Sequence, residues 1–313
     1  MNVPRRQRGV ALLMAMIIVT LVATLASAMI WQQWRAVQVE AAERARAQSA
    51  WILSGALDWA RLILREDAKT AGADHLGEPW SVPLAEARLS TFLAADKSNT
   101  DDAPEAFLSG SITDAQSRYN LRNLIDAQGK VDANELASLQ QLLQSIGVAP
   151  DVADRVATGM HDALAPPGSA GSTNNVPLLP QRIGQLGFFG IDADSIQRMT
   201  PYVVLLPIAT PVNLNTAPRD VIAAVIPGLG TGGAERLVQV RQRTPFKAIA
   251  DAQPYVPSGT TLTPRVSTAS SFFEVHGRLR LTDRVLEETS LIERRGLSMV
   301  PLWRQRESSR DSS

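Results

Sequence analysis

The sequence predicts an α+β fold in which a long N-terminal helix and an antiparallel sheet are interrupted by a large all-α insertion. Three observations predict it. A helix pattern starts in the uncharged stretch Val10–Ile30 and continues to about Lys69. Helical periodicity then dominates roughly Leu121–Ser270. The end of the chain instead alternates apolar and polar residues, which is the period of a half-buried strand.

The uncharged stretch has the length of a membrane anchor. At about 1.5 Å per residue, the helix Val10–Ile30 spans a bilayer core of about 30 Å. Arg5, Arg6 and Arg8 precede it, and cationic flanks stay in the cytoplasm. We therefore expect a single-pass protein with a short cytoplasmic N-terminus and a large domain after Trp31 outside the cytoplasm.

Three processing outcomes are compatible with this N-terminus. The anchor can stay uncut, or ordinary signal peptidase can cut at the small residues Ala26-Ser27-Ala28. The third outcome is cleavage between Gly9 and Val10. This junction, Gly9 followed by VALLMAMIIVTLVATLA, resembles the class III leader of type IV pilins and type II secretion pseudopilins. The resemblance implies cutting and methylation by a prepilin peptidase in the inner membrane.

One position departs from that family pattern. Most such proteins carry Glu at the fifth mature position, where it pairs with the new N-terminus of a neighbouring subunit, and here this position is Met14. An unpaired carboxylate in lipid is costly, so a Glu needs a partner. Its absence predicts a subunit with no neighbour above it, as in the large minor pseudopilin K.

Composition narrows the class of protein. The chain has no Cys among 313 residues, which excludes disulfides, thiolate zinc sites and a cysteine nucleophile. Its 31 basic and 31 acidic residues cancel, so no overall field attracts nucleic acid. The histidines His75, His161 and His276 lie in unrelated segments and are expected at the surface. We predict no enzymatic activity and no cofactor beyond calcium.

The anchor helix is expected to continue into the domain along the stripe Ile52, Ala56, Trp59 and Ile63, with Trp51 and Trp59 packed in a core. A further helix is predicted near Leu84–Ala95. The acidic residues after it offer oxygen ligands of the type that calcium takes, although a solvated loop is favoured. These weak calcium candidates are Asp96, Asp101 and Asp102, together with Asp162.

The segment Ser109–Leu124 contains GSITDAQSRYNLRNL, which predicts a short strand through Ile112. It resembles the signature at the entry to the helical domain of pseudopilin K. Asp114 and Arg118 are interpreted as a local polar pair. Two helices follow, with Asp132 and Asp151 as their expected caps. K subunits carry several carboxylates after the second helix, but this chain has only Asp162 there.

The sharpest soluble motif, VNLNTAPRDVIAAVIPGLGTGG, starts at Val212. Asn215 or Thr216 is expected to cap a helix near Pro218, and a glycine turn leads into a second helix, Gly233–Gln242. The motif resembles a helix-hairpin-helix, the module of sterile-alpha-motif-like folds, and occurs in K subunits as a structural element. Its residues are Asn213, Asn215, Thr216, Pro218, Gly228 and Gly230.

The hairpin leaves a second function open. DNA-binding hairpins hold a phosphate at the turn, and nearby cations can reinforce the contact. A membrane-anchored helix-hairpin-helix DNA receptor is therefore the alternative, beside a type IV pilus minor subunit. The neutral net charge disfavours nucleic acid. The cations in question are Arg236, Arg241, Arg243 and Lys247.

Three terminal strands are predicted, with a disordered polar tail from Gln305. Taken together, the chain resembles the minor pseudopilin K family of type II secretion. The resemblance implies a subunit that, with other minor pseudopilins, starts or caps a pseudopilus tip and helps to export folded proteins, with the exported substrates as further partners. The expected divisions are residues 1–9 (leader), 10–30 (membrane half of the helix), 31–120 (body), 121–270 (inserted helical domain), 271–304 (terminal strands) and 305–313 (tail).

Overall fold

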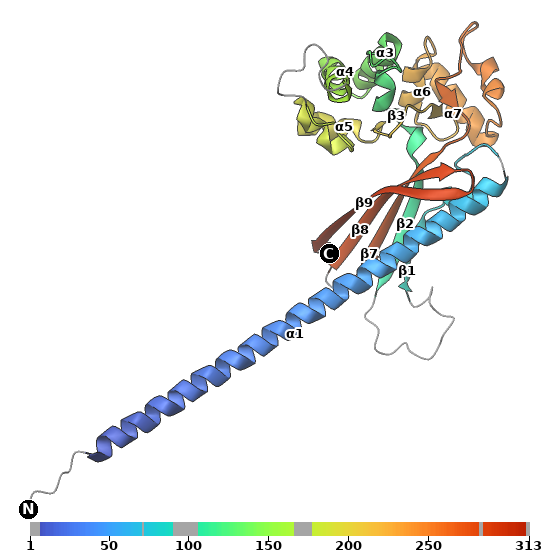
Figure 1. Cartoon of the computed structure of the whole chain (residues 1–313). Coiled ribbons are helices and arrows are strands. Elements are labelled where there is room, and N and C mark those ends of the chain that lie inside the picture. Colours follow the sequence, from blue (N-terminus) through green and yellow to red (C-terminus); the bar gives the residue numbers. More distant parts are fainter. Residues whose placement is uncertain (1–6, 71, 90–105, 166–176, 282–283, 311–313) are drawn as a thin grey trace, which may run out of the picture. The chain divides into compact units, whose positions relative to one another are not determined.

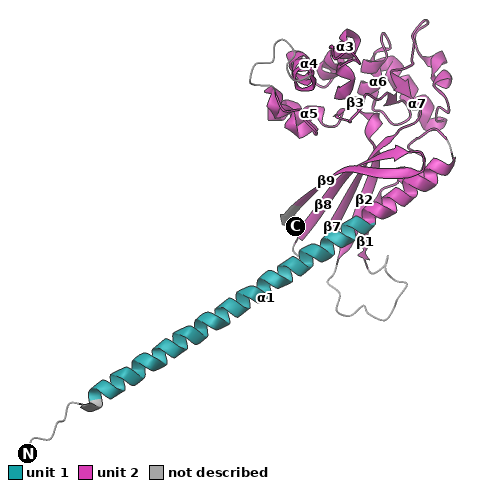
Figure 2. Cartoon of the chain, in the orientation of Figure 1, with its two compact units in different colours: residues 1–55 teal, residues 56–313 magenta. Residues whose placement is uncertain are grey.

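A single helix, α1 (Gln7–Asp67), forms the N-terminal part of the computed structural model (Figure 1). The structure describes residues 7–70, 72–89, 106–165, 177–281 and 284–310. The chain divides within α1 into two units, residues 1–55 and residues 56–313 (Figure 2). The expected long helix is confirmed, and it ends at Asp67 because the chain tightens into a 3-10 turn, η1 (Ala68–Thr70).

The first unit contains the apolar, membrane-type stretch of α1. Among the described residues, α1 is the one helix that is long and apolar enough to cross a membrane. Two of its polar side chains are paired within the helix, since Thr20 donates to the carbonyl of Met16 at 2.9 Å and Thr24 donates to that of Leu21 at 2.8 Å. This internal pairing suits a segment surrounded by lipid, where no water replaces a missing hydrogen bond.

The second unit is built on a five-stranded antiparallel sheet in the order β1-β2-β7-β8-β9. Two strands from the middle of the chain therefore lie beside three from its end, with Ile112 of β2 opposite Val275 of β7. Figure 1 shows this sheet beside the C-terminal part of α1. The strands are β1 (Leu84–Arg88), β2 (Phe107–Asp114), β7 (Phe272–Arg280), β8 (Arg284–Arg295) and β9 (Ser298–Arg310).

Both faces of the sheet carry a core where β7 begins. Phe273 points to the α1 side, where its ring meets Trp80 edge to face at 5.3 Å and both side chains are buried. Leu57 and Leu64 of α1 belong to the same cluster. The neighbouring Phe272 packs on the opposite face with Leu206 and other residues of the helical region. The alternation of strand side chains thus lets one strand join two layers.

The remaining α-helices, α3 to α7, lie between β2 and β7 in the chain and share the largest core. This core contains Leu139, Leu143, Val156, Ile222 and Leu237. Two short parallel pairs, β3 (Tyr119–Asn120) with β4 (Val203–Val204) and β5 (Val212–Asn213) with β6 (Val266–Ser267), accompany them. The helices are α3 (Ala133–Ser145), α4 (Asp151–Leu164), α5 (Ala193–Met199), α6 (Arg219–Val225) and α7 (Gly230–Arg243).

The helix caps are partly as expected. Asp132 caps α3, because its carboxylate accepts the backbone N–H groups of Asn134 and Glu135 at 2.8 and 3.1 Å. Asp151 is not the cap of α4. It is the first helical residue and follows Pro150, which offers no side-chain acceptor. An acidic residue in the first turn still complements the positive end of the helix dipole.

Two sequence-based assignments near the ends of the sheet are wrong. The helix expected over Leu84–Ala95 is wrong for Leu84–Arg88, which forms an edge strand paired with β2; Leu89 is helical, and the remainder from residue 90 lies outside the described residues. The tail is not disordered from Gln305, because β9 continues to Arg310. Pairing with the long strand β8 and an ion pair between Arg306 and the buried Glu288 hold this polar segment in the sheet.

The tryptophans of α1 are also not core residues. Trp51 is 78% exposed and Trp59 is 50% exposed. The buried face of α1 in the second unit is lined by Leu57, Ala60 and Leu64 instead. Of the expected stripe, Ile63 packs against this cluster and Ile52 and Ala56 are half-buried, so only Trp59 is misplaced, because aromatic size does not report which side meets the sheet.

Candidate functional site

The residues predicted for processing lie in the first turns of α1. Gly9 and Val10 are helical and exposed, and Met14 is 64% exposed one turn later. Arg5 and Arg6 lie outside the described residues. No described charged residue shares the segment from Val10 to Ile30 with Met14. The cleavage and tip-specifying roles of these residues remain predictions.

The glycine-turn motif forms two successive helices, α6 and α7, joined by a turn as its pattern predicts, but with a different start. Pro218 occupies the N-cap position of α6 and provides no side-chain cap, so the assignment of Asn215 or Thr216 as the cap is wrong. Gly228 and Gly230 have φ of 72° and 64°, which explains why glycine stands at both positions of the turn. Helix α7 begins at Gly230 rather than at Gly233.

The side chain of Asn215 instead holds the segment that follows α7. Its amide nitrogen donates to the carbonyl of Phe246, and its oxygen accepts the backbone N–H of the same residue, both at 2.9 Å. Arg241, buried in α7, donates to the carbonyl of Leu214. Burial lowers the pKa of Arg241 to about 10. These bonds fix α7 against the start of the motif.

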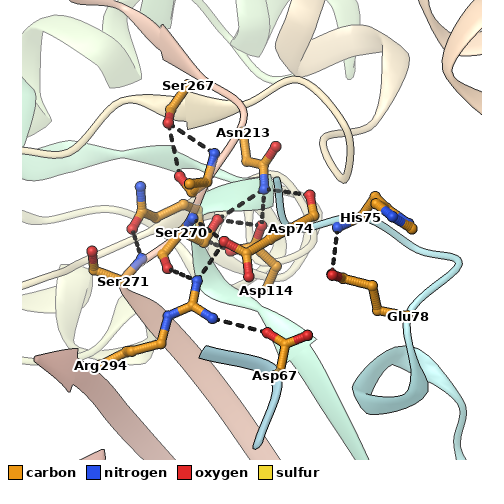
Figure 3. A network of polar contacts seen from close by, with 12 residues as sticks. Asp67, Asp74, His75, Glu78, Asp114, Asn213, Ser267, Ser270, Ser271 and Arg294 are labelled. Atoms are coloured by element: carbon orange, nitrogen blue, oxygen red, sulfur yellow. Dashed lines mark hydrogen bonds and ion pairs between the residues drawn. The ribbon is translucent and has the colours of Figure 1, made fainter. Parts of the chain in front are cut away.

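The buried carboxylate of Asp114, at the end of β2, is the centre of a polar junction between the sheet and the helical region (Figure 3). Its Oδ2 accepts hydrogen bonds from the Asn213 amide at 3.0 Å, the Thr216 hydroxyl at 2.6 Å and the Ser270 hydroxyl at 2.6 Å. Its Oδ1 accepts the backbone N–H of Gln116 at 2.8 Å. Burial raises the pKa of Asp114, and these hydrogen bonds oppose the rise.

Asn213 is the main donor to this junction. Its amide nitrogen lies within hydrogen-bond distance of three acceptors: the Asp114 carboxylate, the Ser270 hydroxyl oxygen at 3.0 Å and the Asp74 carbonyl at 3.1 Å. Its oxygen accepts the backbone N–H of Asn215 at 2.9 Å. One fully buried side chain thus ties the motif to β2, to the segment before β7 and to the loop after α1.

The expected Asp114–Arg118 pair is wrong. Arg118 forms its ion pair with Glu274 of β7 at 2.7 Å, because Asp114 turns inward to cap the 3-10 helix η3 (Ala115–Ser117). Gln116 extends the same junction, since its side chain accepts the backbone N–H of Ser271 at 2.6 Å and donates to the Pro211 carbonyl at 3.0 Å.

An acidic cluster adjoins this junction. Carboxylate oxygens of Asp67, Asp74 and Glu78 lie within 4.8 Å of one another. Arg294 of β8 supplies one positive charge to the cluster, with an ion pair to Asp67 at 3.0 Å and a second to the buried Asp74. The same guanidinium donates to the Ser270 carbonyl and therefore joins the cluster to the junction (Figure 3). We read the cluster as a structural ion-pair network.

The charges in the cluster act on Asp67. Burial, followed by the charges of Glu78 and Asp74, raises the pKa of Asp67 from its usual 3.8 to about 6, and Arg294 opposes this shift. The Asp67 carboxyl therefore has a higher proton affinity in the folded protein than in the unfolded chain.

The calcium candidates do not form a site in the described part of the chain. Asp96, Asp101 and Asp102 lie outside it. Asp162 is exposed on α4 and pairs with His161 at 3.0 Å, and among the described residues it belongs to no group of three acidic or histidine side chains. Calcium takes about six to eight oxygens, so Asp162 with its local partners does not fit this ion.

The cations considered for DNA binding do not gather at the glycine turn. Arg241 is buried and bonded to a carbonyl. Arg243 and Lys247 lie at the far end of α7 from the glycine turn, about 20 Å along a 14-residue helix. The arrangement therefore lacks the cation-reinforced phosphate site that the DNA-receptor hypothesis requires. His75 and His276 are partly exposed and join local hydrogen bonds.

Removing the amide of Asn213 should destabilise the second unit. Asn213→Ala leaves the buried Asp114 carboxylate without one donor and the Asp74 carbonyl without another, so we expect a loss of about 2–4 kcal/mol in unfolding free energy. Chemical denaturation of the full chain measures it. Asn134→Ala, at an exposed position of α3, is the control and should change stability by less than about 0.5 kcal/mol. Equal losses of unfolding free energy in the two variants would contradict a stabilising role of the junction.

Stability should also depend on pH through Asp67. Between pH 3.8 and about 6 the folded chain holds a proton that the unfolded chain has lost, so the contribution of this carboxyl falls as the pH rises. The amide in the variant Asp67→Asn does not titrate. The Tm of Asp67→Asn minus that of wild type should therefore increase from about pH 4 to about pH 6 and then level off.

Thermal unfolding of the two full chains in small pH steps gives this curve. Asp58→Asn removes an exposed carboxyl of the same helix and controls for the loss of a helix carboxylate as such. A difference for Asp67→Asn that decreases with pH, or that Asp58→Asn reproduces, would contradict the assignment.

Comparisons with known proteins agree on one family. Models of the type II secretion system (T2SS) protein K family match residues 117–208 and 212–268. The type II secretion system protein K of Pseudomonas aeruginosa is 27% identical over 93% of this chain and 90% of its own length. That of Klebsiella pneumoniae is 30% identical over 78% of each chain.

A solved structure shares the fold. A chain in the crystal structure of the GspK-GspI-GspJ complex from the enterotoxigenic Escherichia coli type 2 secretion system matches with a TM-score of 0.60. It is 18% identical and aligns over 86% of this chain and 99% of its own. Together with the identity to the Klebsiella relative over most of its length, these matches show that the chain belongs to the type II secretion system protein K family.

Proposed function

We propose that this protein K acts as the minor pseudopilin at the tip of a type II secretion pseudopilus, where it starts or caps the filament and aids the export of folded proteins. The observation that carries the proposal is the apolar residue at position 14. From Val10 to Ile30 the helix presents no described carboxylate. A subunit that lacks the Glu usual at this position has no carboxylate to pair with the N-terminus of a subunit above it.

The architecture supports the same placement. The helices α3 to α7 are inserted between β2 and β7, and they occupy one end of the sheet (Figure 1). The junction around Asp114 holds them there through several buried hydrogen bonds. Such a rigid mass at one end of a filament subunit would obstruct further subunits on that side, which suits a terminal position.

Partners follow by analogy with the solved complex. The structurally similar chain comes from a GspK-GspI-GspJ complex, and we propose that this chain likewise assembles with I-type and J-type minor pseudopilins. We propose the inner membrane as its location, with α1 as the anchor and the second unit in the periplasm.

Processing between Gly9 and Val10 completes the proposal. This bond lies in the first turn of α1, whose backbone N–H groups have no partner within the helix. Unwinding that turn to present an extended substrate to a prepilin peptidase costs little, since helix ends fray readily.

The tip role predicts a specific effect of charge at position 14. In cells that carry only the variant, Met14→Glu should lower both recovery of the minor-pseudopilin complex and secretion by about tenfold or more. The reason is that an unpaired carboxylate in a bilayer costs about 2–3 kcal/mol. Co-purification from membranes and secreted enzyme activity measure the two effects.

Met14→Gln is the matched control, because it has the length of Glu without the charge. It should retain most of the secretion. Wild-type assembly and secretion by Met14→Glu would contradict the tip assignment, whereas failure of both variants would show that position 14 requires an apolar residue for membrane insertion alone.

A further inference from the structure

A basic groove lies between α7 and the 3-10 helix η6 (Ile249–Tyr255). Its volume is about 690 Å³, within the range of about 300–1,000 Å³ that is usual for ligand clefts. One wall carries exposed side chains of α7, and the opposite wall carries the segment after it with Tyr255. The lining residues that bear charge or an aromatic ring are Arg236, Arg243, Phe246, Lys247, Asp251 and Tyr255.

The cations of this groove have no hydrogen-bond or ion-pair partner in the described part of the chain. Arg236, Arg243 and Lys247 are exposed, and their side chains make no hydrogen bond or ion pair to any described residue. By contrast, other exposed arginines such as Arg155 and Arg198 pair with an acid on their own helix. Three unpaired positive charges around one hollow are thus a local feature of a chain whose net charge is zero.

The single acid in the groove does not neutralise them. The Asp251 carboxylate accepts the backbone N–H groups of Lys247 and Ala248, both at 2.9 Å, and so caps the start of η6. Phe246 is buried beneath the groove, and its ring lies 6.3 Å from that of the partly exposed Tyr255. The groove therefore combines a positive rim with an apolar, aromatic floor.

We propose that this groove binds an acidic, extended peptide segment of a partner protein, with carboxylates on the three cations and an apolar side chain against Tyr255. Charge complementarity selects the partner, because a carboxylate placed here meets guanidinium and ammonium groups that have no other counterion in the described chain. The assignment rests on the groove alone and does not require the tip position.

A peptide fits these residues better than DNA. The groove is concave and limited to one end of α7, whereas a duplex is bound through phosphate contacts spread along a basic stripe or face. The glycine turn that would hold a phosphate lies at the other end of α7. The aromatic floor provides apolar contact for a side chain, which a sugar-phosphate backbone does not offer.

Fluorescence anisotropy with the full chain in detergent tests the proposal. The probe is a fluorescein-labelled peptide, Glu-Asp-Phe-Glu-Asp, and the neutral probe Gln-Asn-Phe-Gln-Asn has the same shape. A labelled DNA duplex is the third probe. The key variant carries Arg236→Gln, Arg243→Gln and Lys247→Gln. The control, Arg304→Gln, removes an exposed arginine of β9 that likewise has no partner in the described chain.

We expect the acidic peptide to bind with a Kd below about 1 mM, and the neutral peptide to bind at least about tenfold more weakly. The triple variant should weaken acidic-peptide binding by about tenfold or more, and Arg304→Gln by less than about twofold. The Kd should rise with salt, since screening weakens exposed charge pairs.

Three results would overturn the proposal: no acidic-peptide binding up to about 1 mM, equal binding of the acidic and neutral peptides, or equal losses in the triple variant and in Arg304→Gln. Tighter binding of the duplex than of the peptide, lost in the triple variant, would reassign the groove to nucleic acid. Unchanged thermal unfolding of the triple variant shows that any lost binding is not a loss of fold.

Discussion

The burial of the Asp114 carboxylate is the constraint on which the second unit depends. A carboxylate removed from water must be surrounded by donors. Here they come from the neighbouring Gln116 and from two distant segments of the chain, one with Asn213 and Thr216 and the other with Ser270. The carboxylate can stay buried at the end of β2 only if the chain brings Asn213, Thr216 and Ser270 back to it. The polar junction therefore fixes how the helices leave the sheet and re-enter it.

The apolar cores on either side explain why such a costly junction is stable. Phe273 and Trp80 close one face of the sheet at its start, and Phe272 closes the other against the helical region. Arg294 connects the layers, because it pairs with Asp67 at the end of α1 and with Asp74, and it donates to the Ser270 carbonyl. Packing excludes water, and exclusion of water makes each missing donor expensive. The junction thus selects one arrangement among those that hydrophobic packing alone allows.

Local signals in the sequence were sufficient for the long helix, the helix capped by Asp132 and the three terminal strands, because periodicity and capping depend on neighbouring residues. They failed where distant contacts decide. Leu84–Arg88 became a strand through pairing with β2, and the Asn213 motif tethers the sheet instead of capping a helix. Asp74 and Arg294 carry no local pattern, since their ion pair joins residues 220 positions apart. Asp114 stands out in the sequence as part of its motif, but no local pattern points to its distant partners.

The N-terminal residue of the protein in the membrane fraction tests the account most directly, because the proposed tip role requires removal of a leader before Val10. Mass spectrometry would compare cells with and without prepilin peptidase. The account predicts a chain that begins at Val10 and that is found only when the peptidase is present. A chain that begins at Met1, Asn2 or Met29 in peptidase-containing cells would contradict it and would place the protein outside the pseudopilus.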